Sequence, residues 1–456
     1  MATNLIYGIH DRPPFSKLVL FAFQQLLAII AATIAVPAIV GNGMSASAAL
    51  FGAGVGTLVY QLFTKFRSPV FLGSSFAFID SMSAAFAGAT SMSLGYLGLL
   101  VGALFGGLVY VILAVMVKLA GVSWINKLMP PVVIGPTVSL IGLSLASSAV
   151  KDVFSYAHQN SGGSFIMTDK VWFAFLCALV TLTVVILCSA YGKKMTRLTP
   201  FIIGLVVGYA LALVLTVVGY TAHVDAMKVI DFTPFTDLAA DGVELKTFLS
   251  VPDFSFIRAI DGIKDFDWSY LATIAVAYVP VAFVVFAEHI AEHKELSTVI
   301  EQDLLEDPGL HRTLLGDGVG SIAGAFFGGC PNTTYGESIG CMAITHNASV
   351  ATISATAVLS ILISFFSPVV ALLDSIPDCI MGGVCITLYG YIAVSGMKMM
   401  QKVHLSDSAN LFTVAVILIT GVGGMSIAIG EVVITSIACA LILGILVNTL
   451  LTKRKK

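Results

Sequence analysis

The sequence predicts an all-α membrane protein that crosses the bilayer many times. Of its 456 residues, 57% are hydrophobic and only 11% are charged, whereas roughly a quarter of the residues in an average soluble domain are charged. The mean hydropathy is +0.97. Apolar runs close to the ~20 residues that a helix needs to cross the hydrocarbon core recur along the whole chain. These observations exclude an ordinary soluble domain, and the net charge of −3 gives no reason to expect a nucleic-acid partner.

We predict about fourteen membrane spans, seven on each side of one long hydrophilic segment, residues 221–268. Each predicted span is an apolar run of roughly membrane-crossing length. The seven runs of the first half are 18–40, 46–63, 70–88, 96–117, 130–149, 171–191 and 200–220. The seven of the second half are 269–292, 313–329, 331–347, 350–373, 376–397, 409–426 and 430–451.

The loop charges predict the orientation of the chain. With an even number of spans, both termini lie on one side of the membrane. That side would hold 17 of the 23 Lys and Arg residues, including the basic tail 453–456, and the other side would hold 6. Cytoplasmic loops are enriched in Lys and Arg. We therefore expect a multi-pass protein of the cell membrane with both termini in the cytoplasm.

The third span of each half is interrupted by glycine and polar residues. The sequence is VFLGSSFAF at 70–78 and GGCPNTTYGE at 328–337. A unit of seven spans is odd, so a second copy would be inserted in the opposite direction, and paired interruptions in such repeats mark the substrate site of secondary transporters. Non-helical backbone at membrane depth is tolerated only where protein or internal water satisfies it. A simple water-facing loop remains the alternative for 328–337.

The stretch VAFVVFAEHIAEHKE, residues 281–295, places acids at the end of a long apolar run. Glu288 and Glu292 are four residues apart and share one face of a helix, and His289 and His293 share a neighbouring face. An acid within the bilayer is costly and is a functional hypothesis by default. We therefore expect a functional role for Glu288 and consider one for Glu292.

The end of the same stretch has a simpler interpretation. His293, Lys294 and Glu295 would be solvated if the helix leaves the membrane at this point. Solvated charges at a helix end need no functional explanation.

A metal site is the rival explanation for part of this stretch. Residues 289–293, HIAEH, fit H-x-x-E-H, in which two histidines bind zinc and the glutamate acts as a base. A pattern of five residues is weak evidence, and the sequence shows no third zinc ligand at a characteristic spacing from this motif. The seven cysteines form no CxxC pair and lie mostly in apolar runs, so we expect buried thiols without disulfides. An intramembrane zinc protease is therefore a distant alternative, and we expect no metal or other cofactor.

Five short motifs resemble a known family. LGSSFAF, FAEHI, DPGLHR, PNTTYGESIG and MAIT, in this order and spacing, resemble the bacterial uracil:proton symporters of the nucleobase–ascorbate transporter (nucleobase:cation symporter-2) family. The resemblance extends over nearly the whole chain, from RPPF at 12–15 to IPDCIMGGV at 376–384. It implies a proton-coupled importer that works by alternating access, with uracil favoured as substrate. A xanthine, urate or other purine permease of the same fold and an uncoupled facilitator remain alternatives.

The resemblance also implies an architecture. Spans 1–4 and 8–11 would form a core domain, spans 5–7 and 12–14 a gate domain, and spans 3 and 10 would each contain a short strand. Members of the family commonly form homodimers through their gate domains. The implied segments are 1–150 (core spans 1–4 and the start of the gate), 151–268 (gate spans 6–7 and the hydrophilic loop), 269–375 (core spans 8–11) and 376–456 (gate spans 12–14 and the basic tail).

The family's substrate site maps onto five positions. Glu288 and Glu337 match its two substrate-binding glutamates. Phe76 and Gly336 match positions whose backbone N–H groups face the base, and Ala32 matches a residue of span 1 that lines the site. The resemblance therefore implies a nucleobase bound between spans 3 and 10.

Proton coupling is where this chain departs from the family pattern. The family assigns coupling to a glutamate and a histidine of span 8. Glu288 matches the glutamate, but Glu292 occupies the position of the histidine, and His293 lies beside it. Gln25 stands where span 1 of the family has histidine, and Ser338 follows Glu337 where asparagine is usual. We therefore expect Glu288, Glu292 and His293 to carry the proton coupling, with Glu292 supplying the missing titrating group.

Overall fold

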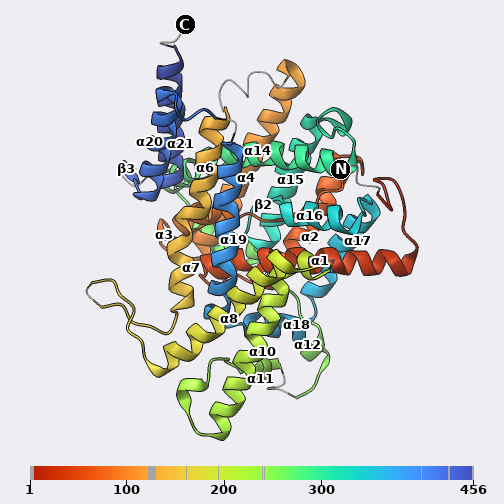
Figure 1. The fold of residues 1–456 in the computed structure, drawn as a ribbon, viewed down its shortest axis with the longest axis vertical. Helices are drawn as coiled ribbons and strands as arrows, with labels where there is room; N and C mark the ends of the chain where they lie inside the picture. The colour runs from red at the N-terminus through yellow and green to blue at the C-terminus, as the bar shows by residue number, and fades with distance from the viewer. Residues whose placement is uncertain are drawn as a thin grey trace. The chain divides into compact units, whose positions relative to one another are not determined.

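The computed structural model describes residues 5–121, 130–160, 162–193, 195–238, 240, 242–401, 403–429 and 432–453 (Figure 1). Residues 454–456 of the predicted cytoplasmic tail lie outside this range. Packing divides the chain into two compact units. Unit 1 comprises residues 1–144, 252–362 and 391–456, and unit 2 comprises residues 145–251 and 363–390.

Unit 1 contains the candidate site and most of the helices. Its N-terminal elements are α1 (Phe15–Val40), α2 (Ala46–Phe63), β1 (Leu72–Ser74), η1 (Phe76–Phe78), α3 (Ile79–Ala87), α4 (Met92–Ala120) and α6 (Pro131–Ser144). The middle segment contributes α13 (Ser255–Ala259), η3 (Ile260–Asp265), α14 (Trp268–Ile300), η4 (Leu305–Gly309), α15 (Leu310–Gly328), β2 (Asn332–Thr334), α16 (Gly336–Thr345) and α17 (Val350–Ser364). The C-terminal elements are α20 (Ser408–Val422), β3 (Ile427–Ile429), β4 (Val432–Ile434) and α21 (Ser436–Lys453).

Unit 2 is smaller and includes residues 221–251 of the hydrophilic segment. Its elements are α7 (Ala146–Val153), α8 (Asp169–Tyr191), α9 (Met195–Leu198), α10 (Pro200–Thr221), η2 (Asp225–Met227), α11 (Thr233–Leu238), α12 (Leu245–Phe248), α18 (Ser367–Asp374) and the first part of α19 (Asp378–Met399). Between α10 and α14 the described residues form only short helical turns. Residues 221–268 are therefore a hydrophilic connection, as the sequence predicts.

The mostly helical, multi-pass prediction is confirmed. Among the described residues, eight helices are long and apolar enough to cross a membrane, and α3, α17, α20 and α21 belong to shorter apolar helices. Helix α14 begins where Asp267 Oδ1 accepts a hydrogen bond from the Tyr270 N–H at 2.7 Å. It continues to Ile300, which is eight residues beyond the predicted end of its span.

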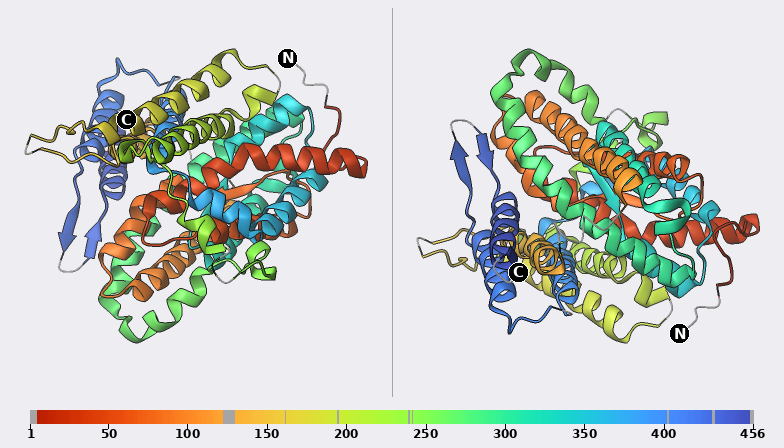
Figure 2. Two further views of the ribbon diagram at one scale, coloured as in Figure 1. Left: turned by 90° about the horizontal axis from the view of Figure 1, so that it is seen from below. Right: turned by 90° about the horizontal axis from the view of Figure 1, so that it is seen from above.

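The predicted span 430–451 is wrong at its start, because β4 occupies residues 432–434 and α21 begins at Ser436. Strands β3 and β4 form an antiparallel hairpin between α20 and α21, with Ile427 paired to Ile434. Figure 2 shows the two strands side by side in both views. Residues 430 and 431, where the last span is predicted to begin, lie outside the described residues. The isoleucine- and valine-rich sequence suits a strand as well as an apolar helix, so hydropathy alone does not separate the two.

Glycines let three helices of unit 1 approach closely. Helix α15 packs against both α2 and α4. A Cβ at Gly320 would lie 2.7 Å from the Gly56 carbonyl oxygen, and one at Gly318 would lie 2.8 Å from the Gly107 carbonyl oxygen. Small residues at such crossings let helix backbones touch in membrane proteins. This packing fixes α15 beside the strand pair described next.

Gly320→Ala is expected to lower the melting temperature of the detergent-purified protein by several degrees or to prevent folding. The added methyl group would press on a backbone oxygen and on Leu72 Cδ1 at 2.8 Å, and overpacking of this kind costs about 1–3 kcal/mol. Gly390→Ala is the matched control, because a Cβ there has no neighbour within 4 Å. Equal melting temperatures for the two variants would contradict the close-packing argument.

The interrupted third spans of the two halves pair with each other. Strand β1 runs antiparallel to β2, with Leu72 opposite Thr334 and Ser74 opposite Asn332. Gly329 adopts a positive φ of 74° at the end of α15, a conformation that glycine adopts without strain. The chain can therefore reverse from α15 into β2.

Side chains from neighbouring helices satisfy the backbone and side chains of this ribbon. The Thr57 hydroxyl accepts a hydrogen bond from the Leu72 N–H at 2.9 Å and donates one to the Leu72 carbonyl. The Asn332 N–H donates to Ser321 Oγ at 3.0 Å, and the Asn332 side chain donates to the Gly52 carbonyl at 3.0 Å. Extended backbone among membrane helices requires such partners. The interruption is thus a built part of the core and not a water-facing loop.

Candidate functional site

Three carboxyl groups come together where α14 meets the start of α16. Glu288 and Glu292 lie on α14, Glu337 lies in the first turn of α16, and the two helices are in contact. All three are half-buried and close enough to interact electrostatically. A Cβ built at Gly336 would lie 3.5 Å from Glu292 Oε1. The structure therefore brings together four of the predicted site residues.

No Lys, Arg or His of the described residues forms an ion pair with these acids. Glu292 Oε2 is buried and has no hydrogen-bond partner. Several ionised acids in a low-dielectric environment without a counter-charge are strongly unfavourable. The cluster is suited to hold protons, to accept hydrogen bonds from a ligand, or to do both.

The start of α16 adds hydrogen-bond donors to the acids. The helix begins at Gly336, directly after β2. The first N–H groups of a helix have no partner inside the helix, and the helix dipole places partial positive charge at this end. Gly336 is half-buried, and the nearest heavy atom to its Cβ position is Glu292 Oε1. A ligand here could meet donors and acceptors within a few ångströms of each other.

Of the three remaining predicted site residues, Phe76 and Ala32 lie on neighbouring elements, and His293 is described below. Phe76 is half-buried and begins η1, which contacts α14. Ala32 is fully buried in α1, the helix that packs against β1, α3 and α16. On the same helix, Gln25 Nε2 lies 3.2 Å from both Ser338 O and Ser338 Oγ. Gln25 and Ser338, which both depart from the family pattern, are therefore hydrogen-bonded to each other.

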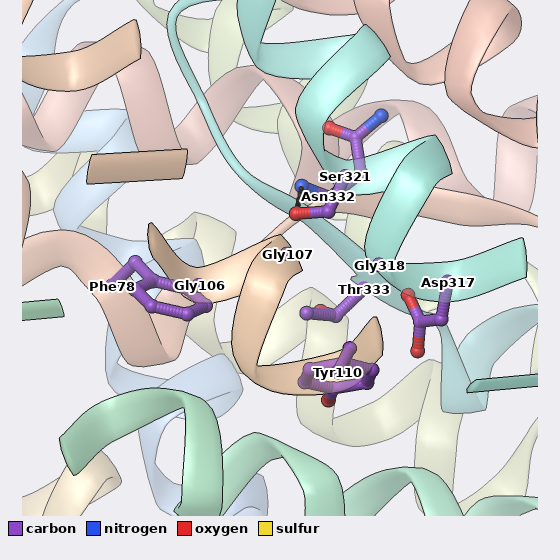
Figure 3. A pocket seen from close by; sticks show the side chains of 9 residues that line it. All are labelled: Phe78, Gly106, Gly107, Tyr110, Asp317, Gly318, Ser321, Asn332 and Thr333. Atoms are coloured by element: carbon purple, nitrogen blue, oxygen red, sulfur yellow. Dashed lines mark hydrogen bonds between the residues drawn. The ribbon is translucent and has the colours of Figure 1, made fainter. Parts of the chain in front are cut away.

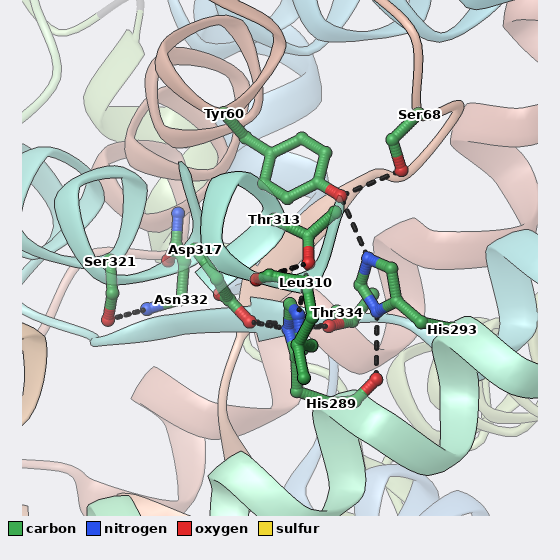
Figure 4. A network of polar contacts seen from close by, with 10 residues as sticks. All are labelled: Tyr60, Ser68, His289, His293, Leu310, Thr313, Asp317, Ser321, Asn332 and Thr334. Atoms are coloured by element: carbon green, nitrogen blue, oxygen red, sulfur yellow. Dashed lines mark hydrogen bonds and ion pairs between the residues drawn. The ribbon is translucent and has the colours of Figure 1, made fainter. Parts of the chain in front are cut away.

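The two histidines of α14 do not share the environment of the acids. His289 and His293 are buried, and their rings stack with centroids 3.9 Å apart. His293 Nδ1 donates to the His289 carbonyl at 2.8 Å, and its Nε2 lies 2.9 Å from the Tyr60 hydroxyl (Figure 4). The expectation that His293 is solvated is wrong, because α14 continues well past it and α2 supplies Tyr60. Lys294 and Glu295 are exposed as expected.

Sequence reasoning missed the partner of His289. Its Nδ1 atom lies 2.6 Å from Asp317 Oδ2, and both side chains are fully buried. Its Nε2 atom lies 3.0 Å from Thr313 Oγ1. The sequence did indicate Asp317, because it is an acid inside the apolar run 313–329, and an acid within a membrane span is a functional candidate by default.

A small cavity lies beside Asp317. Its volume is about 10 Å³, and its lining includes Tyr110, Asp317 and Thr333 (Figure 3). Asp317 Oδ1 and the Tyr110 hydroxyl are buried and have no hydrogen-bond partner among the described residues. A cavity of this size holds about one water molecule.

The geometry does not favour the HIAEH zinc site. All four ring nitrogens of His289 and His293 have protein hydrogen-bond partners. In the part of the chain that the structure describes, no group of three or more His, Cys, Asp or Glu residues could hold a metal ion. All seven cysteines are free and buried, as their apolar surroundings predict.

Solved structures share this fold at low sequence identity. The transmembrane domain of the cyanobacterial bicarbonate transporter BicA aligns with a TM-score of 0.61 at 14% identity, over 97% of this chain and 100% of that one. The murine anion transporter Slc26a9 in the inward-facing state aligns with a TM-score of 0.64 at 11% identity, over 98% of this chain and 69% of that one. These similarities support a transporter-type membrane fold.

Curated relatives are similar over almost their whole length. Uracil permease of Bacillus subtilis (strain 168) is 38% identical over 98% of this chain and 96% of its own length. Uracil permease of Escherichia coli (strain K12) is 33% identical over 97% and 93%, and the putative pyrimidine permease RutG of that strain is 31% identical over 97% and 91%. A family model described as "Permease family" matches residues 16–430. The chain therefore belongs to this permease family, as its resemblance to the nucleobase:cation symporter-2 family predicts, and it is a transporter and not an enzyme.

Proposed function

We propose that this protein imports a nucleobase, with uracil as the leading candidate, across the cell membrane together with protons. The observation that carries the proposal is the cluster of Glu288, Glu292 and Glu337 at the start of α16, which has no ion-pair partner among the described residues. The uracil permeases that resemble the chain over their whole length support the choice of substrate. The intramembrane protease is no longer an alternative for a member of this family.

The chemistry of the cluster fits the edge of a planar heterocycle. Uracil presents N–H donors and C=O acceptors side by side on one edge. An ionised carboxyl only accepts hydrogen bonds, whereas a neutral carboxyl can also donate one. We assign Glu288 and Glu337 to the N–H groups of the base, and the backbone N–H groups of Gly336 and Phe76 to its carbonyl oxygens. Ala32 would line the site from α1.

We further propose that the chain works by alternating access with a fourteen-span, inverted 7+7 repeat. The antiparallel pairing of β1 with β2, one from each half, supports the repeat. The core would comprise spans 1–4 and 8–11, and the gate spans 5–7 and 12–14. Mutual packing of α6, α20 and α21 supports a separate group of gate helices. Cytoplasmic termini and a homodimer through the gate complete the proposal.

A thermal-shift panel on detergent-purified protein tests the substrate. A ligand that binds only the folded state stabilises it by RT ln(1 + [L]/Kd), or about 2.7 kcal/mol at a hundredfold excess over Kd. Among uracil, thymine, xanthine, hypoxanthine, guanine, adenine and urate, we expect uracil to raise the melting temperature most. Stabilisation by a purine instead would show that Glu292 has reset the specificity. A panel without any stabilising base would overturn the proposed function.

A further inference from the structure

The hydrogen bonds around His289 fix which of its nitrogens carries a proton. The Thr313 hydroxyl donates its only hydrogen to the Leu310 carbonyl at 3.0 Å. With its hydrogen placed there, the hydroxyl oxygen is left to accept a hydrogen bond from His289 Nε2, which lies 3.0 Å away. A neutral imidazole carries a proton on one nitrogen only. A neutral His289 thus has its lone pair on Nδ1, the atom that faces Asp317.

A second proton must lie between His289 and Asp317. Nδ1 and Oδ2 are 2.6 Å apart, which is a short, strong hydrogen-bond distance. A lone pair on Nδ1 facing an ionised carboxylate would place two acceptors in contact. The nearby donor is the Thr334 hydroxyl, which lies 3.4 Å from Oδ2 and 3.5 Å from Nδ1, too far to place a hydrogen between two atoms that are 2.6 Å apart. Either Asp317 is a neutral acid that donates to Nδ1, or His289 is a cation that donates to a carboxylate.

The surroundings favour the neutral acid. Both side chains are fully buried, and charge separation in a low-dielectric interior is costly. The titratable side chains that interact with Asp317 are Tyr60, Tyr110, Glu288, Glu292 and His293. None of these is Lys or Arg, and two are acids. They offer no fixed positive charge to stabilise an Asp317 carboxylate.

We propose that Asp317 is a protonated, hydrogen-bond-donating acid that joins α15 to α14, and that its second oxygen binds one buried water. The donated hydrogen bond runs from Oδ2 to His289, the residue directly after Glu288. The joint therefore positions Glu288 through the neighbouring face of α14. Oδ1 and the Tyr110 hydroxyl lie at the cavity of about 10 Å³ and supply two polar partners for the water. The inference holds whatever base is transported.

Infrared spectroscopy of protein labelled with ¹³C at the aspartate carboxyl carbon tests the protonation state. At neutral pH, wild-type protein is expected to show the C=O band of a protonated aspartic acid, and Asp317→Asn to lack it. Asp261→Asn is the matched control, because Asp261 is exposed and paired with Lys264, so the band should persist. If wild type shows no such band, or if Asp317→Asn keeps it, the proposal is overturned.

A second measurement keeps the test decisive if Asp317→Asn fails to fold. Asp80, on α3, is another half-buried aspartic acid, and the proposal assigns the band to Asp317 and not to Asp80. The labelled Asp80→Asn variant should therefore still show the band, and its loss there would overturn the assignment to Asp317.

Rescue by the conservative variant tests the positioning role. The asparagine amide can donate to His289 Nδ1, so Asp317→Asn should bind the stabilising base of the thermal-shift panel with a Kd within about threefold of wild type. Asp317→Ala leaves buried His289 without its donor and should raise the Kd by roughly tenfold or more. Equal Kd values for Asp317→Ala and Asp317→Asn would contradict the role of Asp317 as a hydrogen-bond donor. That outcome is distinct from a failure of the proposed function, in which no base of the panel would stabilise the wild-type protein.

Discussion

Replacing Glu288 by Gln is expected to weaken nucleobase binding by roughly 5- to 150-fold. Loss of one partner from a buried polar edge costs about 1–3 kcal/mol, and 1.4 kcal/mol is tenfold in Kd. Glutamine keeps the size of the side chain and one acceptor oxygen, but its NH2 group replaces the second acceptor oxygen by a donor, and the side chain loses its charge and its ability to exchange a proton. The Kd is measured by calorimetry or thermal shift with the base that stabilises the wild type most.

The matched control is Glu295→Gln on the same helix. Glu295 is exposed, whereas Glu288 is half-buried beside Glu292 and Glu337. The control should change the Kd by less than about twofold, because exposed substitutions away from special features usually change free energies by less than ~0.5 kcal/mol. Equal affinities for Glu288→Gln and wild type would remove Glu288 from the proposed binding site.

The spacing of residues along α14 predicted its acidic face, but not the contacts of the two histidines on the neighbouring face. Glu288 and Glu292 share a helix face because they are four residues apart, and the structure places both beside Glu337. His293 was expected to be solvated because hydropathy falls at 293–295, yet Tyr60 of α2 and the continuation of α14 bury it. Tertiary packing, which no local pattern encodes, decides whether a polar side chain at a span end meets water or a partner.

Long-range pairing explains the rest of what sequence reasoning missed. Asp317 is 28 residues from His289 along the chain, and nothing near 313–329 indicates which side chain it meets. The pairing of β1 with β2 joins residues more than 250 positions apart. Glycine and threonine mark both segments as interruptions, but their register depends on Thr57, Ser321 and other side chains of the flanking helices. The sequence therefore predicts where a membrane span is interrupted, but not which segment the interrupted backbone pairs with.

Replacing Glu292 by Gln is expected to abolish proton-driven accumulation of the base while leaving its binding within about threefold of wild type. Glu292 stands where the family has a histidine, and its Oε1 lies close to Gly336 at the start of α16. Its Oε2 is buried and has no hydrogen-bond partner among the described residues, so the carboxyl has a free site at which a proton could be carried. Glutamine cannot carry that proton.

The size of the expected loss follows from the membrane potential. One charge moving inward across about 100 mV contributes roughly 2.3 kcal/mol, which supports about 50-fold accumulation. In proteoliposomes with an imposed potential and pH gradient, Glu292→Gln should bring accumulation down to simple equilibration, and an uncoupler should do the same to wild type. Glu292→His should restore accumulation, because imidazole also titrates near neutral pH. If Glu292→Gln accumulates the base like wild type, the coupling proton is carried elsewhere, and Glu288 or the buried pair of His289 and Asp317 becomes its next candidate carrier.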